Sequence, residues 1–383
     1  MMIMNALLEN RKDDPIETDA LFSPLKLGSL TLRNRFAVAP MTRVSATAEG
    51  VPTQRMADYY ASFADGGFGL VITEGLYTDK AFSQGYLFQP GLIDSTHEGG
   101  WRPIIQRVRG QGAFMIAQLM HAGALSQGNP HRGDTRGPSA VRPKGRQMAF
   151  YRGAGDYPLP SAMSFAEISE AVAGFVQAAR LAQAAGFDGV EIHGANGYLL
   201  DQFLSQGVNH RDDRYGGDLE GRLRLIVEVV LAVRTAVGPS FIVGLRISQG
   251  KVNDFLYKWE GEGEAVAIFE QLGRLPIDYL HTTEFEAWRP AFDAGESLAA
   301  LAKRHVSVPV LANGSLHDLD QAVGLVERKE ADFISLGRGA LAYPDRPRRI
   351  AAHMRLDPFD PGVLSPIADL QNADRYGRAT LSC

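Results

Sequence analysis

The chain has 383 residues, of which 45% are hydrophobic and 22% are charged. This composition is typical of a folded protein with a large apolar core, and the length is compatible with one domain or two. The formal net charge of −5, from 39 basic and 44 acidic residues, provides no field that would attract nucleic acid or an anionic membrane. These numbers exclude a disordered chain and a polybasic binding protein.

The sequence contains a single cysteine, Cys383, at its last position. One thiol excludes an intrachain disulfide, a thiolate-held iron–sulfur cluster and a structural zinc site, which indicates a reducing compartment. The N-terminal residues contain no basic segment followed by a long apolar core, and no stretch reaches the roughly 18 apolar residues of a membrane span. We therefore expect a cytoplasmic protein with no metal, membrane or nucleic-acid partner.

Short apolar runs bounded by glycine or polar residues are typical of buried parallel strands. The sequence contains eight of them, at 36–39, 69–74, 114–118, 189–193, 241–246, 279–282, 308–312 and 333–336. Pro309 stands inside one run, where a proline is tolerated only as the first residue of the strand.

Segments with helical spacing follow these runs, at about 53–65, 97–111, 164–185, 219–237, 262–273, 296–305, 316–329 and 346–355. The repeated alternation of strand and helix predicts an α/β fold, a (β/α)₈ TIM barrel. Leu25 to Leu32 alternates around a Gly-Ser turn, which predicts a hairpin that closes the bottom of the barrel. A doubly wound open sheet is the competing fold, but the turn after the first run, Pro40-Met41-Thr42, lacks the glycine pattern of that fold.

We expect an N-terminal extension over residues 1–20, the barrel over 21–355 and a C-terminal tail over 356–383. The connection 119–163, which follows the third strand, is rich in Gly, Pro and Arg. Loops of that length in compact domains usually serve as functional covers, so we expect this one to roof the pocket.

The densest group of polar residues follows the strand at 189–193. His193, Asn196 and Tyr198 come just past its apolar run, where α/β barrels place their chemistry. Each residue alone has an ordinary explanation, such as a hydrogen-bonded histidine or an Asn-Gly turn. Together they form the candidate active site.

The last two strand ends predict an anion site. Gly314 and Ser315 precede a helix, and Gly337 and Arg338 follow the next strand. Backbone N–H groups at a helix start and a guanidinium are suited to a phosphate. The alternative is ordinary helix capping beside a surface arginine.

Gln118 and Arg246 each end an apolar run on two other strands. A buried arginine needs an electron-rich partner, either a carboxylate such as Glu191 or Glu74 or an oxygen atom of a cofactor. A flat heterocycle with carbonyl oxygens, tied to a phosphate, would satisfy both this pair and the anion site. Flavin mononucleotide, FMN, fits that description.

The sequence resembles the Old Yellow Enzyme family of FMN-dependent NADH:flavin oxidoreductases and ene-reductases. The resemblance extends from about Leu21 to about Ile350. The resemblance rests on an ordered set of motifs, which are Leu21-Phe-Ser-Pro-Leu with Leu32-Arg-Asn-Arg35, Ala39-Pro-Met-Thr-Arg43, Gln118-Leu-Met-His-Ala-Gly123, Gly186 to Leu200, Asn209-His-Arg-Asp-Asp-Arg-Tyr-Gly-Gly217, and Gly337-Arg338.

The resemblance implies a role for each candidate residue. The residues implied to hold FMN are Pro40, Met41, Thr42 and Gly75 along the ring, Gln118 and Arg246 at its pyrimidine edge, and Gly314, Ser315, Gly337 and Arg338 at the phosphate. His193 and Asn196 would bind the carbonyl or nitro oxygen of the substrate. Tyr198 would donate a proton, and Thr42 would bond the flavin carbonyl beside the reactive nitrogen.

The implied activity is transfer of hydride from NADH or NADPH, through FMN, to activated alkenes such as enones, enals, maleimides and nitroalkenes. The resemblance is also compatible with a homo-oligomer. Two other classes stay open, a phosphate-binding barrel isomerase or lyase and a non-catalytic flavin-binding sensor. Tyr376 and Arg378 in the tail either belong to a solvated segment or reach an active site, as C-terminal residues do in some members of the family.

Overall fold

The computed structural model describes residues 17–380, with side chains up to Tyr376. The eight predicted strands form a closed barrel in which every neighbouring pair is parallel, and pairing of the last strand with the first closes it. They are β3 (Phe36–Val38), β4 (Leu70–Ile72), β6 (Phe114–Met120), β9 (Gly189–Asn196), β10 (Ile242–Lys251), β11 (Tyr279–Thr283), β12 (Val310–Asn313) and β13 (Phe333–Leu336). The predicted (β/α)₈ fold is confirmed.

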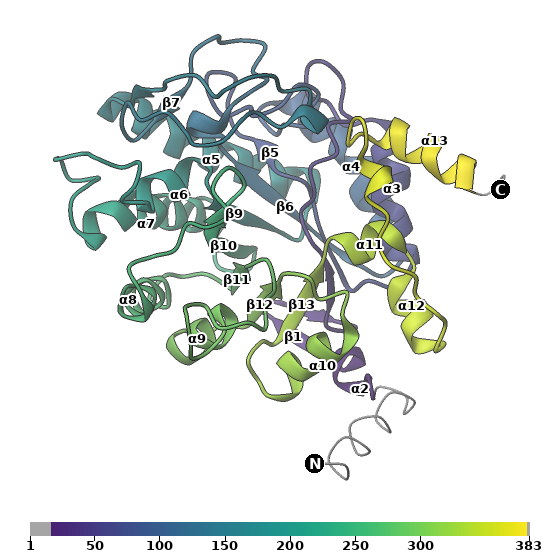
Figure 1. Cartoon of the computed structure of the whole chain (residues 1–383). Coiled ribbons are helices and arrows are strands. Elements are labelled where there is room, and N and C mark those ends of the chain that lie inside the picture. Colours follow the sequence, from purple (N-terminus) through teal and green to yellow (C-terminus); the bar gives the residue numbers. More distant parts are fainter. Residues whose placement is uncertain (1–16, 381–383) are drawn as a thin grey trace.

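The predicted helices surround the barrel within a few residues of their expected bounds (Figure 1). They are α3 (Gln54–Asp65), α4 (Ser95–Gly110), α5 (Phe165–Ala185), α7 (Leu219–Val237), α8 (Glu262–Leu272), α9 (Leu298–His305), α10 (Leu319–Glu327) and α12 (Arg346–Ala351). Side chains cap the first turns of six of these helices, α3, α4, α5, α7, α9 and α10. Ser164 and Glu167 form a capping box at α5, and Asp218 accepts the Gly221 N–H at the start of α7.

The N-terminal hairpin closes one end of the barrel. It consists of β1 (Leu25–Leu27) and β2 (Leu30–Leu32), follows the short helix α2 (Asp19–Phe22), and is antiparallel. Leu27 and Leu32 are fully buried in one cluster with residues from the beginnings of the barrel strands, including Tyr279 and Phe333. Because the hairpin blocks that end, a small molecule reaches the barrel only where the strands finish.

Three strands continue two or more residues further than the apolar pattern predicted. β6, β9 and β10 run past Gln118, His193 and Arg246, and Lys251 of β10 still pairs with Asn196 of β9. The strand ends there carry polar side chains, so the apolar run stops although backbone pairing does not. β12 begins at Val310, so Pro309 lies before the strand rather than in it.

Several short elements were not predicted. They are β5 (Leu76–Tyr77), β7 (Arg136–Gly137), β8 (Ser161–Ala162), α6 (Leu199–Leu204), α11 (Arg338–Ala342), α13 (Leu370–Thr380) and three 3₁₀ turns, Gly123–Leu125, Ala149–Tyr151 and Pro361–Leu364. Most are too short to display a period, and α13 is strongly polar.

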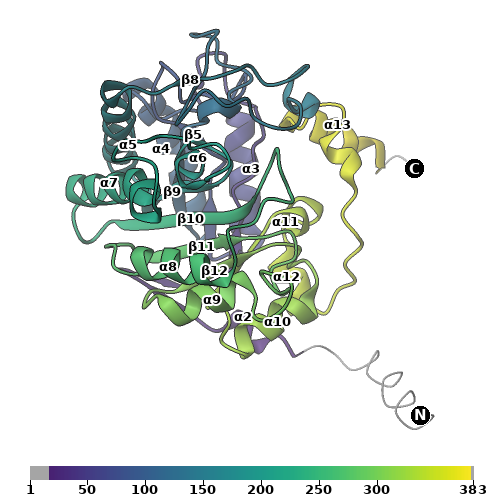
Figure 2. The same cartoon turned by 60° about the vertical axis from the view of Figure 1, so that its left-hand side comes forward.

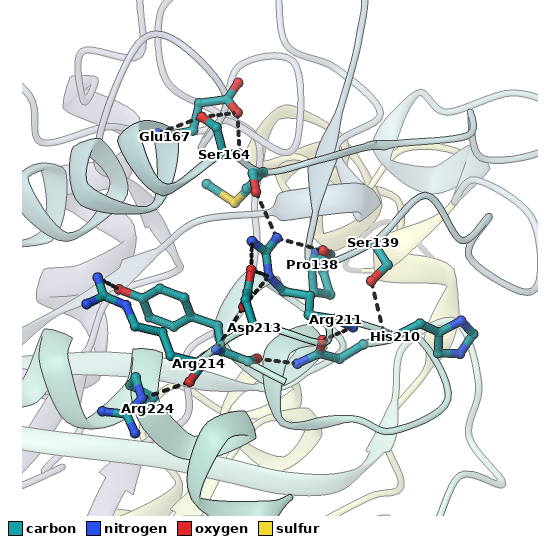
Figure 3. A network of polar contacts seen from close by, with 12 residues as sticks. Pro138, Ser139, Ser164, Glu167, His210, Arg211, Asp213, Arg214 and Arg224 are labelled. Carbon is teal, nitrogen blue, oxygen red and sulfur yellow. Dashed lines mark hydrogen bonds and ion pairs between the residues drawn. The ribbon is translucent and has the colours of Figure 1, made fainter. Parts of the chain in front are cut away.

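The insert 119–163 is anchored to the loop that precedes α7 (Figure 3). The Arg211 guanidinium donates to the carbonyl oxygens of Pro138, at 2.9 Å, and Met163, at 2.7 Å. The His210 N–H donates to the Ser139 Oγ at 2.9 Å. The motif at 209–217 therefore holds the insert across the top of the molecule, and the insert is not a free loop.

Both ends of the chain continue beyond the barrel. Of the extension predicted over residues 1–20, residues 1–16 lie outside the described part. The tail runs along one side of the molecule from α12 to α13 (Figure 2), and Asp374 of α13 forms an ion pair with Arg55 of α3. Among residues 17–380, no helix is both long and apolar enough to cross a membrane.

Candidate active site

The C-terminal ends of the barrel strands surround a cavity of about 420 Å³. Every residue that the sequence assigned to a site lies on its wall, namely Pro40, Met41, Thr42, Gly75, Gln118, His193, Asn196, Tyr198, Arg246, Gly314, Ser315, Gly337 and Arg338. The structure therefore brings the candidates together, whereas their individual roles stay predictions.

The segment Pro40–Val44 is fixed to the wall by Glu74. The carboxylate of Glu74 accepts the N–H groups of Arg43, at 2.9 Å, and Val44, at 3.3 Å, and the Tyr60 hydroxyl at 3.2 Å. Burial raises the pKa of Glu74 to about 7, although these donors and the nearby guanidinium of Arg43 act in the opposite direction. Glu74 is therefore not the partner of Arg246.

Among the described residues no ion pair joins Glu191 to Arg246 either, although the positive charge of Arg246 still acts on Glu191. Its carboxylate accepts from Gln118 Nε2 at 2.7 Å, from the Tyr279 hydroxyl at 2.9 Å and from His281 Nδ1 at 2.8 Å. Burial alone would raise the pKa of Glu191, but His281, Arg246 and Gln118 lower it to about 2. The carboxylate thus stays charged and holds Gln118 by its amide nitrogen, which leaves Gln118 Oε1 as an acceptor.

Arg246 is 5% exposed and has an unsatisfied donor at the cavity. Its Nη2 donates to Thr283 Oγ1 at 3.2 Å and Asn313 Oδ1 at 3.1 Å, whereas its buried Nε has no partner among the described residues. A buried unpaired donor is costly, so a ligand oxygen here is favoured. The donor of Arg246 and the acceptor of Gln118 fit the pyrimidine edge of a flavin.

The wall beside β12 and β13 fits a phosphate. Arg338 is exposed at the cavity, donates to Ser315 Oγ at 3.0 Å and lies over the Phe285 ring at 5.4 Å. Gly314 has φ 141°, and a Cβ there would stand 2.3 Å from the Glu284 carbonyl oxygen, so only glycine fits. The capping alternative is wrong for α10, because Asp318 caps that helix.

His193 is held as a neutral donor. Its Nδ1 accepts the N–H of Ala195 at 3.3 Å, so the proton of the neutral ring is on Nε2. Burial, and secondly Arg246, lower the pKa of His193 well below its ordinary value. Neighbouring Asn196 adopts a left-handed φ of 62°, and its backbone N–H donates to Ser248 Oγ at 2.8 Å. The ring of His193 thus presents an N–H rather than a base.

Tyr198 is paired with a residue that the sequence did not indicate. Its hydroxyl lies 2.5 Å from the hydroxyl of Tyr86, and its ring packs edge-on against His193 with the centroids 4.9 Å apart. Burial raises the pKa of Tyr198 above its ordinary value, so the hydroxyl remains protonated at neutral pH. Tyr86 lies in an irregular segment after β5, where neither spacing nor a strand end marks it.

Residues of the insert and of the tail complete the wall of the cavity. The sequence predicted that the insert would cover the pocket, but it did not predict a contribution from the tail at Leu364. Met148, Phe150 and Tyr151 of the insert line the cavity. Leu364 of the tail also lines it. Tyr376 lies at a different cavity and bonds Asp360, and the side chain of Arg378 lies outside the described residues.

Comparisons with known proteins agree with this geometry. Residues 20–357 match the model of the NADH:flavin oxidoreductase / NADH oxidase family. The chain is 36% identical to a probable flavin mononucleotide-dependent alkene reductase of Leishmania infantum, over 90% of this chain and 94% of that one. A solved structure of morphinone reductase with tetrahydroNAD superposes with a TM-score of 0.81 at 31% identity, over 92% of this chain and 96% of that one. The structure of an Old Yellow Enzyme homologue from Zymomonas mobilis also gives 0.81, at 32% identity, over 88% of this chain and 94% of that one.

Proposed function

The chain belongs to the Old Yellow Enzyme family of NADH:flavin oxidoreductases, and from that premise we propose that it reduces activated alkenes such as enones, enals, maleimides and nitroalkenes. It is an NAD(P)H-dependent flavin oxidoreductase with FMN as its cofactor. When bound, reduced FMN supplies a hydride to the β-carbon of the alkene.

The clamp for the substrate oxygen would consist of His193 and Asn196. Addition of hydride at the β-carbon places negative charge on the carbonyl or nitro oxygen, and donors aimed at that oxygen lower the barrier. His193 supports this role because its ring is neutral, with the proton on Nε2. Asn196 supplies a carboxamide on the same wall, and no hydrogen bond from a described residue occupies it.

The proton for the α-carbon would come from Tyr198. Its hydroxyl is held by Tyr86 at 2.5 Å, on the cavity that His193 and Asn196 also line. A buried phenol is protonated at neutral pH and can give its proton to an enolate, which is a stronger base. The observation that carries the proposal is that a neutral histidine with its proton on Nε2, a carboxamide and a protonated phenol line one cavity.

A spectroscopic assay tests the proposal. The purified protein should be yellow, NADH or NADPH should bleach the flavin absorbance without oxygen, and an enone such as 2-cyclohexenone should restore it. A colourless protein would favour a phosphate-binding isomerase or lyase. A yellow protein that neither nicotinamide bleaches would instead be a flavin-binding sensor, and one bleached but never reoxidised by any of the four alkene classes would contradict alkene reduction.

A further inference from the structure

A buried ion pair stands directly behind the turn that carries Asn196 and Tyr198. Lys251 Nζ lies 2.5 Å from Asp201 Oδ1, and the two side chains are 6% and 0% exposed. Neither residue lines the candidate active site. Burial works against charge on both, since it raises the pKa of Asp201 and lowers that of Lys251.

The second oxygen of this carboxylate holds the turn itself. Asp201 Oδ2 accepts the N–H of Gly197 at 2.6 Å. Asn196 and Gly197 both have left-handed φ angles, 62° and 87°, a conformation that is uncommon outside glycine and that asparagine tolerates better than most residues. The carboxylate therefore stabilises the conformation that puts Asn196 and Tyr198 on the same cavity wall.

Lys251 connects this turn to β10, the strand that pairs with β9. It is the last residue of β10 and pairs with Asn196, and the next residue, Val252, donates its N–H to the Asn196 carbonyl at 3.1 Å. Val252 itself lines the cavity. The pair thus links α6, the Asn196–Tyr198 turn and the end of β10 behind the site.

We infer that Lys251 and Asp201 are positioning residues, whose ion pair sets the Asn196–Tyr198 turn for the chemistry of the cavity. The catalytic part of this inference rests on the proposed function. A buried ion pair contributes little net stability compared with apolar residues of similar volume, whereas removal of one partner leaves an unpaired buried charge. A role in fixing geometry accounts for a pair at this position.

The chain provides a matched control at the other end of the barrel. Lys303 pairs with Asp332 at 2.7 Å, and Asp332 Oδ2 accepts the Val310 N–H at 2.7 Å. As in the Lys251–Asp201 pair, one carboxylate binds a lysine and a backbone N–H, but this pair lies where β12 begins and its side chains are more exposed, at 30% and 22%. Lys303→Met should lower stability without affecting the active-site turn.

The experiment uses three variants, each as the full chain with its flavin. They are Lys251→Met, Lys303→Met and a double variant that carries both Asp201→Asn and Lys251→Met. Hydrogen–deuterium exchange of the Gly197 and Val252 amides is the first measurement. The second is reoxidation of the dithionite-reduced enzyme by 2-cyclohexenone, with reoxidation by oxygen as an internal control because oxygen needs no oxyanion clamp.

Lys251→Met should speed exchange at these amides and slow reoxidation by the enone about tenfold, which corresponds to about 1.4 kcal/mol in the barrier. Flavin content and reoxidation by oxygen should not change. The double variant should recover most of both losses, because it leaves no unpaired charge and the carboxamide introduced by Asp201→Asn can still accept the Gly197 N–H. Recovery also shows that the loss does not come from misfolding.

The inference would be overturned if the Gly197 and Val252 amides exchanged at the same rate in Lys251→Met as in Lys303→Met. Faster exchange with unchanged reoxidation by the enone would also overturn it, because the pair would then be structural only. If the wild-type enzyme reduces none of the alkenes, the proposed function fails, and the exchange comparison alone decides whether the pair holds the turn.

Discussion

Three buried tyrosines around the cavity differ in what their hydroxyls contact. Tyr86 and Tyr198 bond each other, whereas the hydroxyl of Tyr157 has no partner among the described residues. Only Tyr198 of these three lines the cavity. Burial raises the pKa of each one, so protonation does not distinguish them. Access to the cavity and the paired hydroxyl single out Tyr198.

Substitution of Tyr198 by phenylalanine should slow reoxidation of the reduced enzyme by 2-cyclohexenone by about 10² to 10⁴, the usual contribution of a general acid. Flavin reduction by NADPH should be nearly unchanged, because that step needs no proton from Tyr198. Stopped-flow absorbance of each half-reaction measures the two rates. Tyr157→Phe serves as the control and should leave both rates unchanged. Equal losses in the two half-reactions of Tyr198→Phe would contradict the role of proton donor.

The site residues that the sequence predicted are those that stand at strand ends or within local motifs. His193 and Arg246 are such cases, because a polar residue that ends an apolar run is visible without a structure. Tyr86, Tyr151 and, behind the site, the Lys251–Asp201 pair were not visible in the sequence. Their contacts join segments distant in sequence, and no local periodicity encodes such contacts.

At the scale of elements, the barrel was predictable because each strand and helix has its own pattern of burial. α5 is an example of an element with a clear local signal. The sequence predicted that this helix starts at residue 164, and the structure has a capping box at Ser164. Strand ends were less predictable. β10 continues to Lys251 because pairing with β9 persists after the residues cease to be apolar. The tail helix α13 was missed because its sequence is strongly polar.

Loss of the Arg211 clamp should loosen the insert. Arg211→Met removes the hydrogen bonds to the Pro138 and Met163 carbonyl oxygens, so the insert should open more often while the barrel stays folded. Limited trypsin digestion should then cut the insert, at basic residues such as Arg146, several-fold faster than in the wild type. Mass spectrometry of the fragments locates the cut.

A neighbouring arginine supplies the control for this digestion. Arg224 belongs to the same polar network (Figure 3) and donates to the Arg214 carbonyl at 2.8 Å, but it makes no hydrogen bond to the insert. Arg224→Met removes one trypsin site, as Arg211→Met does, and should leave the cutting rate of the insert unchanged. Equal acceleration in both variants would show that the clamp is not specific.

Across the whole molecule, two fully buried carboxylates contribute to stability with opposite dependence on pH. Glu191 is held as a charged acceptor, with its pKa lowered to about 2 by His281, Arg246 and Gln118 against the effect of burial. Burial instead raises the pKa of Glu74 to about 7. Both carboxylates hold other residues of the cavity, so the charge state of each is coupled to the geometry of the site.

The contribution of Glu74 predicts that stability falls as pH rises from about 4.5 to about 7. In this window the folded chain keeps a proton on Glu74 that the unfolded chain releases, so a higher pH favours unfolding. The difference between a pKa of about 7 in the folded chain and the ordinary 4.5 corresponds to about 3 kcal/mol of unfolding free energy. Above the folded pKa no further loss is expected from this group.

Glu74→Gln should remove this fall, because a glutamine carries no titrating proton and can still accept the N–H groups of Arg43 and Val44. Urea unfolding at a fixed excess of FMN, compared at pH 4.5 and pH 7, measures the difference for wild type and variant. Glu170→Gln on the exposed face of α5 is the control and should keep the wild-type slope. If Glu74→Gln lost as much stability between pH 4.5 and pH 7 as the wild type does, Glu74 would be ionised in the folded chain throughout that pH range. The guanidinium of Arg43 would then outweigh the effect of burial.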